Sequence, residues 1–320
     1  MPKVESIDEL RKICQAKLWL YERSVLNPIP WYARYIHLRI SIYITWVLLH
    51  TNVSANQVTV TFMVVGLIAV YLFSFGQPWM YFWGAILLQV RYLLDSVDGE
   101  IARYRKTFSV TGEYLDFIEH YITGGLVFFA LGVGLHRQFE GVIPLYLGFS
   151  SSFGFILINI LYDGKDKYLL HNIMKKIDSL EIRSDDQRIP LDEKGKKKLI
   201  FAASPKNQRL WYKLIKGYSL YPGINNVLLL VALLELLIIR WFPEKYEISL
   251  FYLLLWSYAF FYPISFAKNL YGMVKQRSLD GELKEKLEAL QVLMSGLQDS
   301  KTFERIEGGT SSEHPLGKVS

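Results

Sequence analysis

Aspartate and histidine side chains recur at helical spacing between residues 95 and 120. Asp95 and Asp98 lie three residues apart, and Asp116 and His120 lie four residues apart. Residues at these spacings share one face of an α-helix. The segment between them, Tyr104–Thr111, is just long enough for a tight reversal. We therefore expect two antiparallel helices that present their acidic faces at one level.

Clustered carboxylates of this kind predict a divalent cation. Arg103 alone cannot neutralise three aspartates, and carboxylates without cations repel each other and take up protons. A hard cation accepts oxygen ligands and keeps open positions for phosphate. Gly99 and Ala102 leave the same surface without bulk, so a flat group could approach the backbone there. The alternative is a salt-bridged helix end with ordinary packing of small residues.

The rest of the chain is rich in apolar runs. Of its 320 residues, 51% are hydrophobic and 15% are aromatic. A helical span needs about 20 mostly apolar residues. We predict an all-α polytopic membrane protein with six spans, the second of which crosses only if its helix continues through Arg105. The spans are Val58–Phe75, Trp79–Leu94, Leu115–Leu135, Val142–Tyr162, Ile224–Phe242 and Ile248–Ala267.

The segment Trp31–His50 precedes the first span. Its apolar part, Ile40–Leu49, is too short to cross a bilayer, which favours an interfacial amphipathic helix over a seventh span. We predict three regions: a cytoplasmic segment with the interfacial helix (1–50), a six-span membrane domain (51–275) and a cytoplasmic tail (276–320). The leucine spacing of the tail indicates an amphipathic helix, followed by an end that we expect to be disordered. The membrane domain contains a long basic loop (163–223), interpreted either as a solvated loop or as a lid over the site.

Lysine and arginine are distributed unevenly between the two sides. Both termini and the loops 95–114 and 163–223 carry 32 of these residues, against 3 on the opposite side. Basic residues accumulate on the cytoplasmic side of membrane proteins. We therefore expect the acidic cluster to face the cytoplasm, in the plasma membrane or, if the source is bacterial, the inner membrane. Membrane lipids are the expected surroundings, and nucleic acid is not an expected partner.

At the acidic cluster the sequence resembles the CDP-alcohol phosphotransferase family. The family motif is D-x2-D-G-x2-A-R, about eight residues, then G-x3-D-x3-D. The chain matches it at Asp95, Asp98, Gly99, Ala102, Arg103, Gly112 and Asp116, and has His120 in place of the last aspartate. The run Asn56-Gln-Val-Thr59 resembles the N-x-x-T segment of the family, although an N-cap role for Asn56 or Ser54 explains it equally well.

The resemblance implies a membrane-embedded transferase. Such an enzyme moves a substituted phosphate group from a CDP-linked donor to an acceptor hydroxyl and releases CMP, in phospholipid or related phosphodiester biosynthesis. By resemblance, Asp95, Asp98 and Asp116 hold one or two Mg2+ or Mn2+ ions. The residues expected to contact the CDP-linked substrate are Gly99, Ala102, Arg103, Gly112, Asn56 and Thr59. A homodimer is left open.

The departure at His120 leaves three hypotheses. His120 replaces the family's general base beside Asp116, or Glu119 takes over this role, or the enzyme is weakened or inactive. A neutral imidazole suits a base at cytoplasmic pH. Two rival functions are an ion or solute transporter and an inactive scaffold of the same fold. Glu235, an acid within a span, is expected to form an inter-helix bond or to snorkel.

Overall fold

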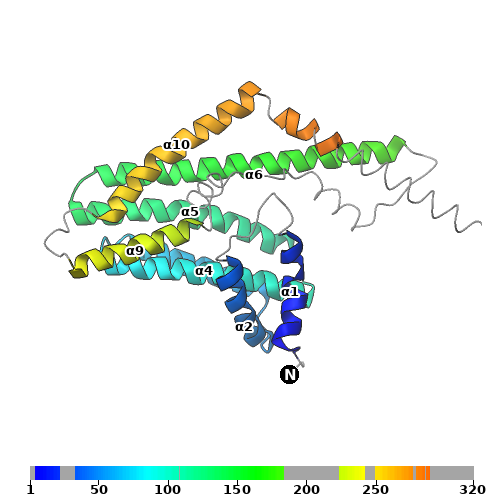
Figure 1. The fold of residues 1–320 in the computed structure, drawn as a ribbon, viewed down its shortest axis with the longest axis horizontal. Coiled ribbons are helices and arrows are strands. Elements are labelled where there is room, and N and C mark those ends of the chain that lie inside the picture. The colour runs from blue at the N-terminus through cyan, green and yellow to red at the C-terminus, as the bar shows by residue number, and fades with distance from the viewer. Residues whose placement is uncertain are drawn as a thin grey trace, which may run out of the picture. The chain divides into compact units, whose positions relative to one another are not determined.

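The computed structural model describes residues 4–21, 33–107, 109–183, 223–241, 249–276, 279–284 and 286–288. Over these ranges the chain is helical with no strand, which confirms the all-α class. In chain order the elements are α1 (Ile7–Tyr21), η1 (Ala33–His37), α2 (Leu38–Leu49), α3 (Ala55–Phe73), α4 (Pro78–Arg105), α5 (Val110–Phe139), α6 (Ile143–Arg183), α9 (Gly223–Trp241) and α10 (Leu250–Gln276) (Figure 1).

Five of these helices are long and apolar enough to cross a membrane: α3, α5, α6, α9 and α10. They account for five of the six predicted spans, and the protein is a polytopic membrane protein. The remaining helix, α4, continues through Arg105 without a break, and at 1.5 Å per residue it is about 42 Å long. Its second half is rich in charged residues. That α4 also crosses the membrane stays a prediction.

The chain forms two compact units. The first comprises Met1–Gly164 with Asn207–Tyr271, and the second Lys165–Lys206 with Gly272–Ser320. Helix α6 extends through Arg183, so the first part of the loop predicted at 163–223 is helical. The charged side chains of this part can be solvated on a helix that leaves the membrane as well as on a loop. The rest of that loop, 184–222, lies outside the described residues.

In the second unit, an ion pair joins α6 to the start of the tail. Lys165 Nζ lies 2.5 Å from Glu282 Oε2, and Lys286 Nζ lies 3.4 Å from Glu282 Oε1. The first two leucines of the predicted tail helix, Leu283 and Leu287, are in helical conformation. The remaining positions of that pattern lie outside the described residues.

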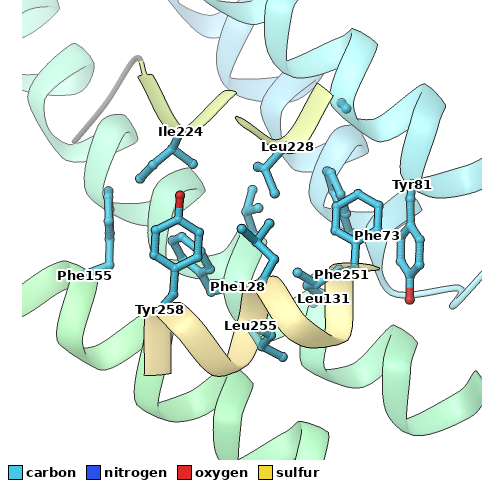
Figure 2. Close-up of a cluster of buried hydrophobic side chains, with 14 of the residues drawn as sticks. Phe73, Tyr81, Phe128, Leu131, Phe155, Ile224, Leu228, Phe251, Leu255 and Tyr258 are labelled. Carbon is cyan, nitrogen blue, oxygen red and sulfur yellow. The ribbon is translucent and has the colours of Figure 1, made fainter. Parts of the chain in front are cut away.

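An aromatic core joins α3, α4, α5, α6, α9 and α10 within the first unit (Figure 2). Phe128 of α5 lies at its centre, with its ring 4.9 Å from Tyr258 of α10 and 5.8 Å from Phe155 of α6. Glycines permit a close contact between two of these helices, since a Cβ on Gly132 of α5 would lie 2.9 Å from Gly148 Cα of α6. Small residues allow such approach between membrane helices. This packing holds the long helices that carry the site.

Helix α2 is amphipathic, with its apolar face outward and hydroxyl groups on its buried face. Its outward stripe is apolar and aromatic, comprising Tyr35 and Ile36 from η1 and Ile40, Tyr43, Trp46 and Val47 from α2. Its buried face includes the hydroxyls of Ser41 and Thr45. At 12 residues α2 is shorter than a span, and an exposed apolar face suits contact with lipid. Both features agree with the interfacial helix that we predicted.

Candidate active site

Three helix ends set the geometry of the site. Helix α3 begins at Ser54, whose side chain accepts from Gln57 N–H while the Gln57 side chain accepts from Ser54 N–H. Helix α5 is capped at its N-terminus by Ser109, whose hydroxyl accepts from Gly112 N–H at 3.2 Å. Helix α4 ends at Lys106, in the left-handed region at φ 55°. Such caps satisfy the free backbone groups of helix ends, and the N-cap of α3 is therefore Ser54 rather than Asn56.

The carboxylates of Asp95 on α4 and Asp116 on α5 meet at the imidazole of His120. His120 Nε2 lies 3.7 Å from Asp95 Oδ2, and His120 Nδ1 lies 3.3 Å from Asp116 Oδ1. One ligand atom from each residue lies within 4.8 Å of the other two. All three residues are partly buried. The antiparallel arrangement expected from the sequence thus brings both acidic faces together.

The contacts of His120 define its tautomer. Nδ1 lies 2.8 Å from the backbone carbonyl oxygen of Asp116. A carbonyl oxygen only accepts, so Nδ1 donates, and the neutral ring keeps its lone pair on Nε2. Nε2 and the Asp95 carboxylate, which it faces, are then both acceptors. A hydroxyl donor or a cation can therefore bind to both groups at once.

Asp98 lies outside this closest group of ligand atoms. Its Oδ2 accepts a hydrogen bond of 2.6 Å from the hydroxyl of Thr59 on α3. The same hydroxyl lies 3.1 Å from the Ala55 carbonyl oxygen. The metal ligands predicted from the sequence were Asp95, Asp98 and Asp116, whereas the structure gathers His120 with the first and last of them. Asp98 is instead linked to the predicted substrate-binding residue Thr59.

The bare surface expected at Gly99 is covered by Arg103. A Cβ on Gly99 would lie 3.1 Å from Arg103 Nη1 and 3.4 Å from Nη2. Arg103 Nε donates to the Cys14 carbonyl of α1 at 2.6 Å. Ala102 is half-buried, and its carbonyl accepts from the N–H of Thr107 at 3.1 Å. Gly99 thus makes room for a guanidinium group, and Ala102 contributes to the end of α4.

Gly112 provides a second close approach, between α5 and α3. A Cβ on Gly112 would lie 2.7 Å from Asn56 Oδ1. The first residues of α3 therefore pack directly against the first turn of α5. Both predicted substrate-binding residues of α3 thus lie against the acidic helices. Asn56 lies beside Gly112 of α5, and Thr59 donates to Asp98 of α4.

A buried ion pair lies one turn from the cluster. Arg91 Nε donates to Glu119 Oε1 at 2.6 Å, and its Nη2 donates to Oε2, so the contact is bidentate. The Thr123 hydroxyl donates to the same carboxylate at 2.6 Å. Both charged side chains are only 2% exposed. Glu119 is committed to Arg91, which counts against the hypothesis that it acts as the general base.

Two residues next to this pair were missed by the sequence reasoning. Thr123 follows Glu119 by one helical turn, and Gly66 of α3 leaves space for the pair. A Cβ on Gly66 would lie 2.9 Å from Thr123 Oγ1 and 3.0 Å from Glu119 Oε1. The available signal was the intramembrane Arg91, because buried charges in membrane helices are usually paired. The partner was not evident, since three other acids lie nearby in the sequence.

The donor set fits a divalent cation. Asp116 Oδ1 is buried and has no hydrogen-bond donor among the residues that the structure describes, although a carboxylate oxygen normally has a donor or cation partner. It lies in the group formed with Asp95 and His120. The two carboxylates suit Mg2+ or Mn2+, which prefer oxygen ligands, and the lone pair on His120 Nε2 then stays available for a proton.

The comparisons with known proteins agree with the motif. No curated protein is detectably similar to the chain. The family model described as CDP-alcohol phosphatidyltransferase matches residues 52–180. The match begins just before α3 and includes both acidic helices and the described part of their connection. Residues 52–180 of the chain are thus similar to the CDP-alcohol phosphatidyltransferase family, in the region that contains the candidate site.

Proposed function

We propose that the protein transfers a substituted phosphate group from a CDP-linked donor to an alcohol acceptor and releases CMP. The observation that supports this most is the convergence of Asp95, Asp116 and His120 from two helices, with ligand atoms within 4.8 Å of one another. The family match gives the broader class of membrane phosphotransferase. The reaction would serve phospholipid or related phosphodiester biosynthesis.

Asp95 and Asp116, with Asp98 on the same helix as Asp95, would hold Mg2+ or Mn2+. A bound divalent cation would neutralise charge on the diphosphate and on departing CMP. Ionised aspartates accept hydrogen bonds and donate none, so their role is to supply negative charge at fixed positions. The Thr59 hydroxyl orients the Asp98 carboxylate through its hydrogen bond of 2.6 Å.

His120 would serve as the general base. Its Nδ1 donates to the Asp116 carbonyl, so Nε2 carries the lone pair. The acceptor oxygen would attack the phosphorus distal to cytidine, and its proton would pass to Nε2. The bond between that phosphorus and the bridging anhydride oxygen would break, and CMP would leave with the electron pair. One P–O bond forms and one breaks, and the proton of the acceptor hydroxyl ends on His120.

The substrate-binding roles of the remaining residues are also proposals. Arg103 would meet a phosphate of the donor, since a guanidinium group binds phosphate through two parallel hydrogen bonds. Gly99 would leave space for this guanidinium, and Gly112 would keep α5 close to α3. Asn56 and Thr59 would contribute from α3, and Ala102 from the end of α4. We propose that this surface faces the cytoplasm, because basic residues concentrate on that side.

The test is CMP release by purified protein with a panel of CDP-alcohols, alcohol acceptors and either Mn2+ or Mg2+. The proposal expects CMP in proportion to phosphodiester product. Asp95→Asn is the matched control, because it removes one charge with little change in volume. Absence of CMP with every donor and acceptor would overturn the proposal. Metal-dependent ion flux in liposomes would then support the transporter hypothesis.

A further inference from the structure

Helix α4 carries a fully buried carboxylate, that of Glu100, between the residues of the acidic motif. Glu100 is 0% exposed. Its Oε1 accepts from Gln15 Nε2 of α1 at 2.8 Å and from the Ser41 hydroxyl of α2 at 2.7 Å. Its Oε2 accepts from the Thr45 hydroxyl of α2 at 2.6 Å. One side chain of α4 therefore binds both N-terminal helices.

One turn after Glu100, α4 makes a second hydrogen bond to α1, at the residue next to Gln15. Arg103 follows Glu100 by three residues, and its Nε donates to the carbonyl of Cys14, the neighbour of Gln15. Residues three apart lie on the same side of a helix. Two neighbouring residues of α1 thus bind two side chains of α4. The Cys14 carbonyl accepts from Arg103, and the Gln15 amide donates to Glu100.

This arrangement exceeds what helix packing alone requires. Apolar residues of α1, α2 and α4 already pack together around Leu10, Ile42 and Ile101, all with 0% exposure. A buried carboxylate adds little net stability, because its desolvation offsets its hydrogen bonds. It does impose one arrangement of its donors, since each unpaired polar group in a buried site is costly. The arrangement imposed here is the one that places Cys14 carbonyl beside Arg103.

We infer that Glu100 is a positioning residue, which fixes Arg103 by holding α1 and α2 against α4. Helix α1 is then part of the substrate-binding apparatus, although it lies outside the region that matches the family. The kinetic consequence rests on the proposed function, because it assumes that Arg103 meets a donor phosphate. The structural consequence, docking of α1 through Glu100, can be tested without any substrate.

The first arm of the experiment uses Cys14, the only cysteine in the sequence. Its thiol is fully buried, so its rate of maleimide labelling in the native detergent-solubilised protein reports on the docking of α1. We expect Glu100→Ala and Gln15→Ala each to increase the rate at least about tenfold. Both variants are needed because Glu100 also raises the pKa of Cys14, and Gln15→Ala leaves that charge in place. Faster labelling in Glu100→Ala alone would be an electrostatic effect and would overturn the inference.

The matched control is Glu235→Ala. Glu235 is also 0% exposed and also accepts from a serine hydroxyl, that of Ser249 at 2.8 Å. It lies near the Trp241 end of α9, which is the end of the bundle opposite α1 (Figure 1). We expect unchanged labelling of Cys14 in this variant. Equal acceleration in Glu235→Ala and Glu100→Ala would indicate general loosening and would contradict the inference.

The second arm measures kinetics of Gln15→Ala, which alters no motif residue. Misplaced Arg103 should raise KM for the CDP-linked donor about tenfold and change kcat much less, because a phosphate contact made in the ground state is lost. In the Arg103→Lys background, Gln15→Ala should have little further effect, since both act through the same guanidinium. Additive effects would overturn the inference. If wild-type protein releases no CMP, the proposed function fails, while the labelling arm still decides the docking role of Glu100.

Discussion

The ion pair of Arg91 and Glu119 gives the sharpest prediction for stability. We consider Arg91→Met, which removes the charge and keeps an unbranched side chain of moderate volume. In this variant the Glu119 carboxylate retains the hydrogen bond from Thr123 and loses both bonds from Arg91. Because both side chains of the pair are 2% exposed, water cannot replace the lost donors without opening the bundle.

The magnitude follows from this burial. Removal of one partner of a buried pair costs about 3–5 kcal/mol, which is a factor of at least about a hundred in the unfolding equilibrium. Glu119→Gln should cost a similar amount, because it leaves a guanidinium without its counter-charge. The double variant Arg91→Met/Glu119→Gln contains neither charge, and should be within about 2 kcal/mol of wild type. The two single effects are therefore expected to be strongly non-additive.

Reversible unfolding of the detergent-solubilised protein measures these free energies. Turnover below the unfolding temperature should also fall in Arg91→Met, because Arg91 precedes Asp95 by one turn and Glu119 adjoins His120. Single variants that cost less than about 1 kcal/mol would refute the reasoning, as would a double variant whose cost equals the sum of the two. A folded, inactive Glu119→Gln beside a normally active His120→Ala would assign the general base to Glu119.

Other changes have equally definite outcomes. Asp95→Asn should reduce CMP release by about 10²-fold or more while size-exclusion profiles stay unchanged, since it removes charge at the cation site. His120→Ala should lower kcat with little change in KM for the CDP-linked donor, and His120→Asp should retain part of the activity; normal turnover of His120→Ala would exclude it as the base. Glu235→Leu should destabilise the protein by about 1–3 kcal/mol, measured by chemical unfolding, because the Ser249 hydroxyl loses its acceptor. Burial raises the pKa of Cys14 to about 11, so the maleimide labelling rate should rise about tenfold per pH unit near neutrality, as the thiolate is the reactive form.

The helical architecture was predictable because it depends on local composition. Five apolar runs became helices long enough to span, and α4 continues through Arg105 as its length required. The helical start of the segment predicted as a loop at 163–223 has a physical origin. Charged residues from Asp163 onwards end the apolar run but not the helix, because lysine, leucine and glutamate all favour helix in water. Hydropathy locates the membrane boundary, and helix propensity locates the helix end.

The candidate site was predictable only in part, for a related reason. Spacing indicates which side chains share a face, and it placed Asp95, Asp98 and Asp116 together. It cannot rank the neighbours that compete for each carboxylate. Asp98 accepts from Thr59, and His120 takes its place in the closest group of ligand atoms. Both outcomes depend on how α3, α4 and α5 pack, which sequence spacing does not contain.

The same limit explains why Glu100 was missed although it lies inside the motif. Its donors come from residues 85, 59 and 55 positions away in the chain. One local sign was nevertheless present: Ser41 and Thr45 lie in a mostly apolar helix at a spacing of four, which puts two hydroxyls on one face. A hydroxyl that points away from lipid either bonds to a carbonyl of its own helix or finds an acceptor on a neighbouring helix. Two inward-facing hydroxyls in the helix before the acidic motif therefore indicate an acceptor on a neighbouring helix. The motif contains one acid without a proposed catalytic role, Glu100, and it is this residue that accepts from both hydroxyls.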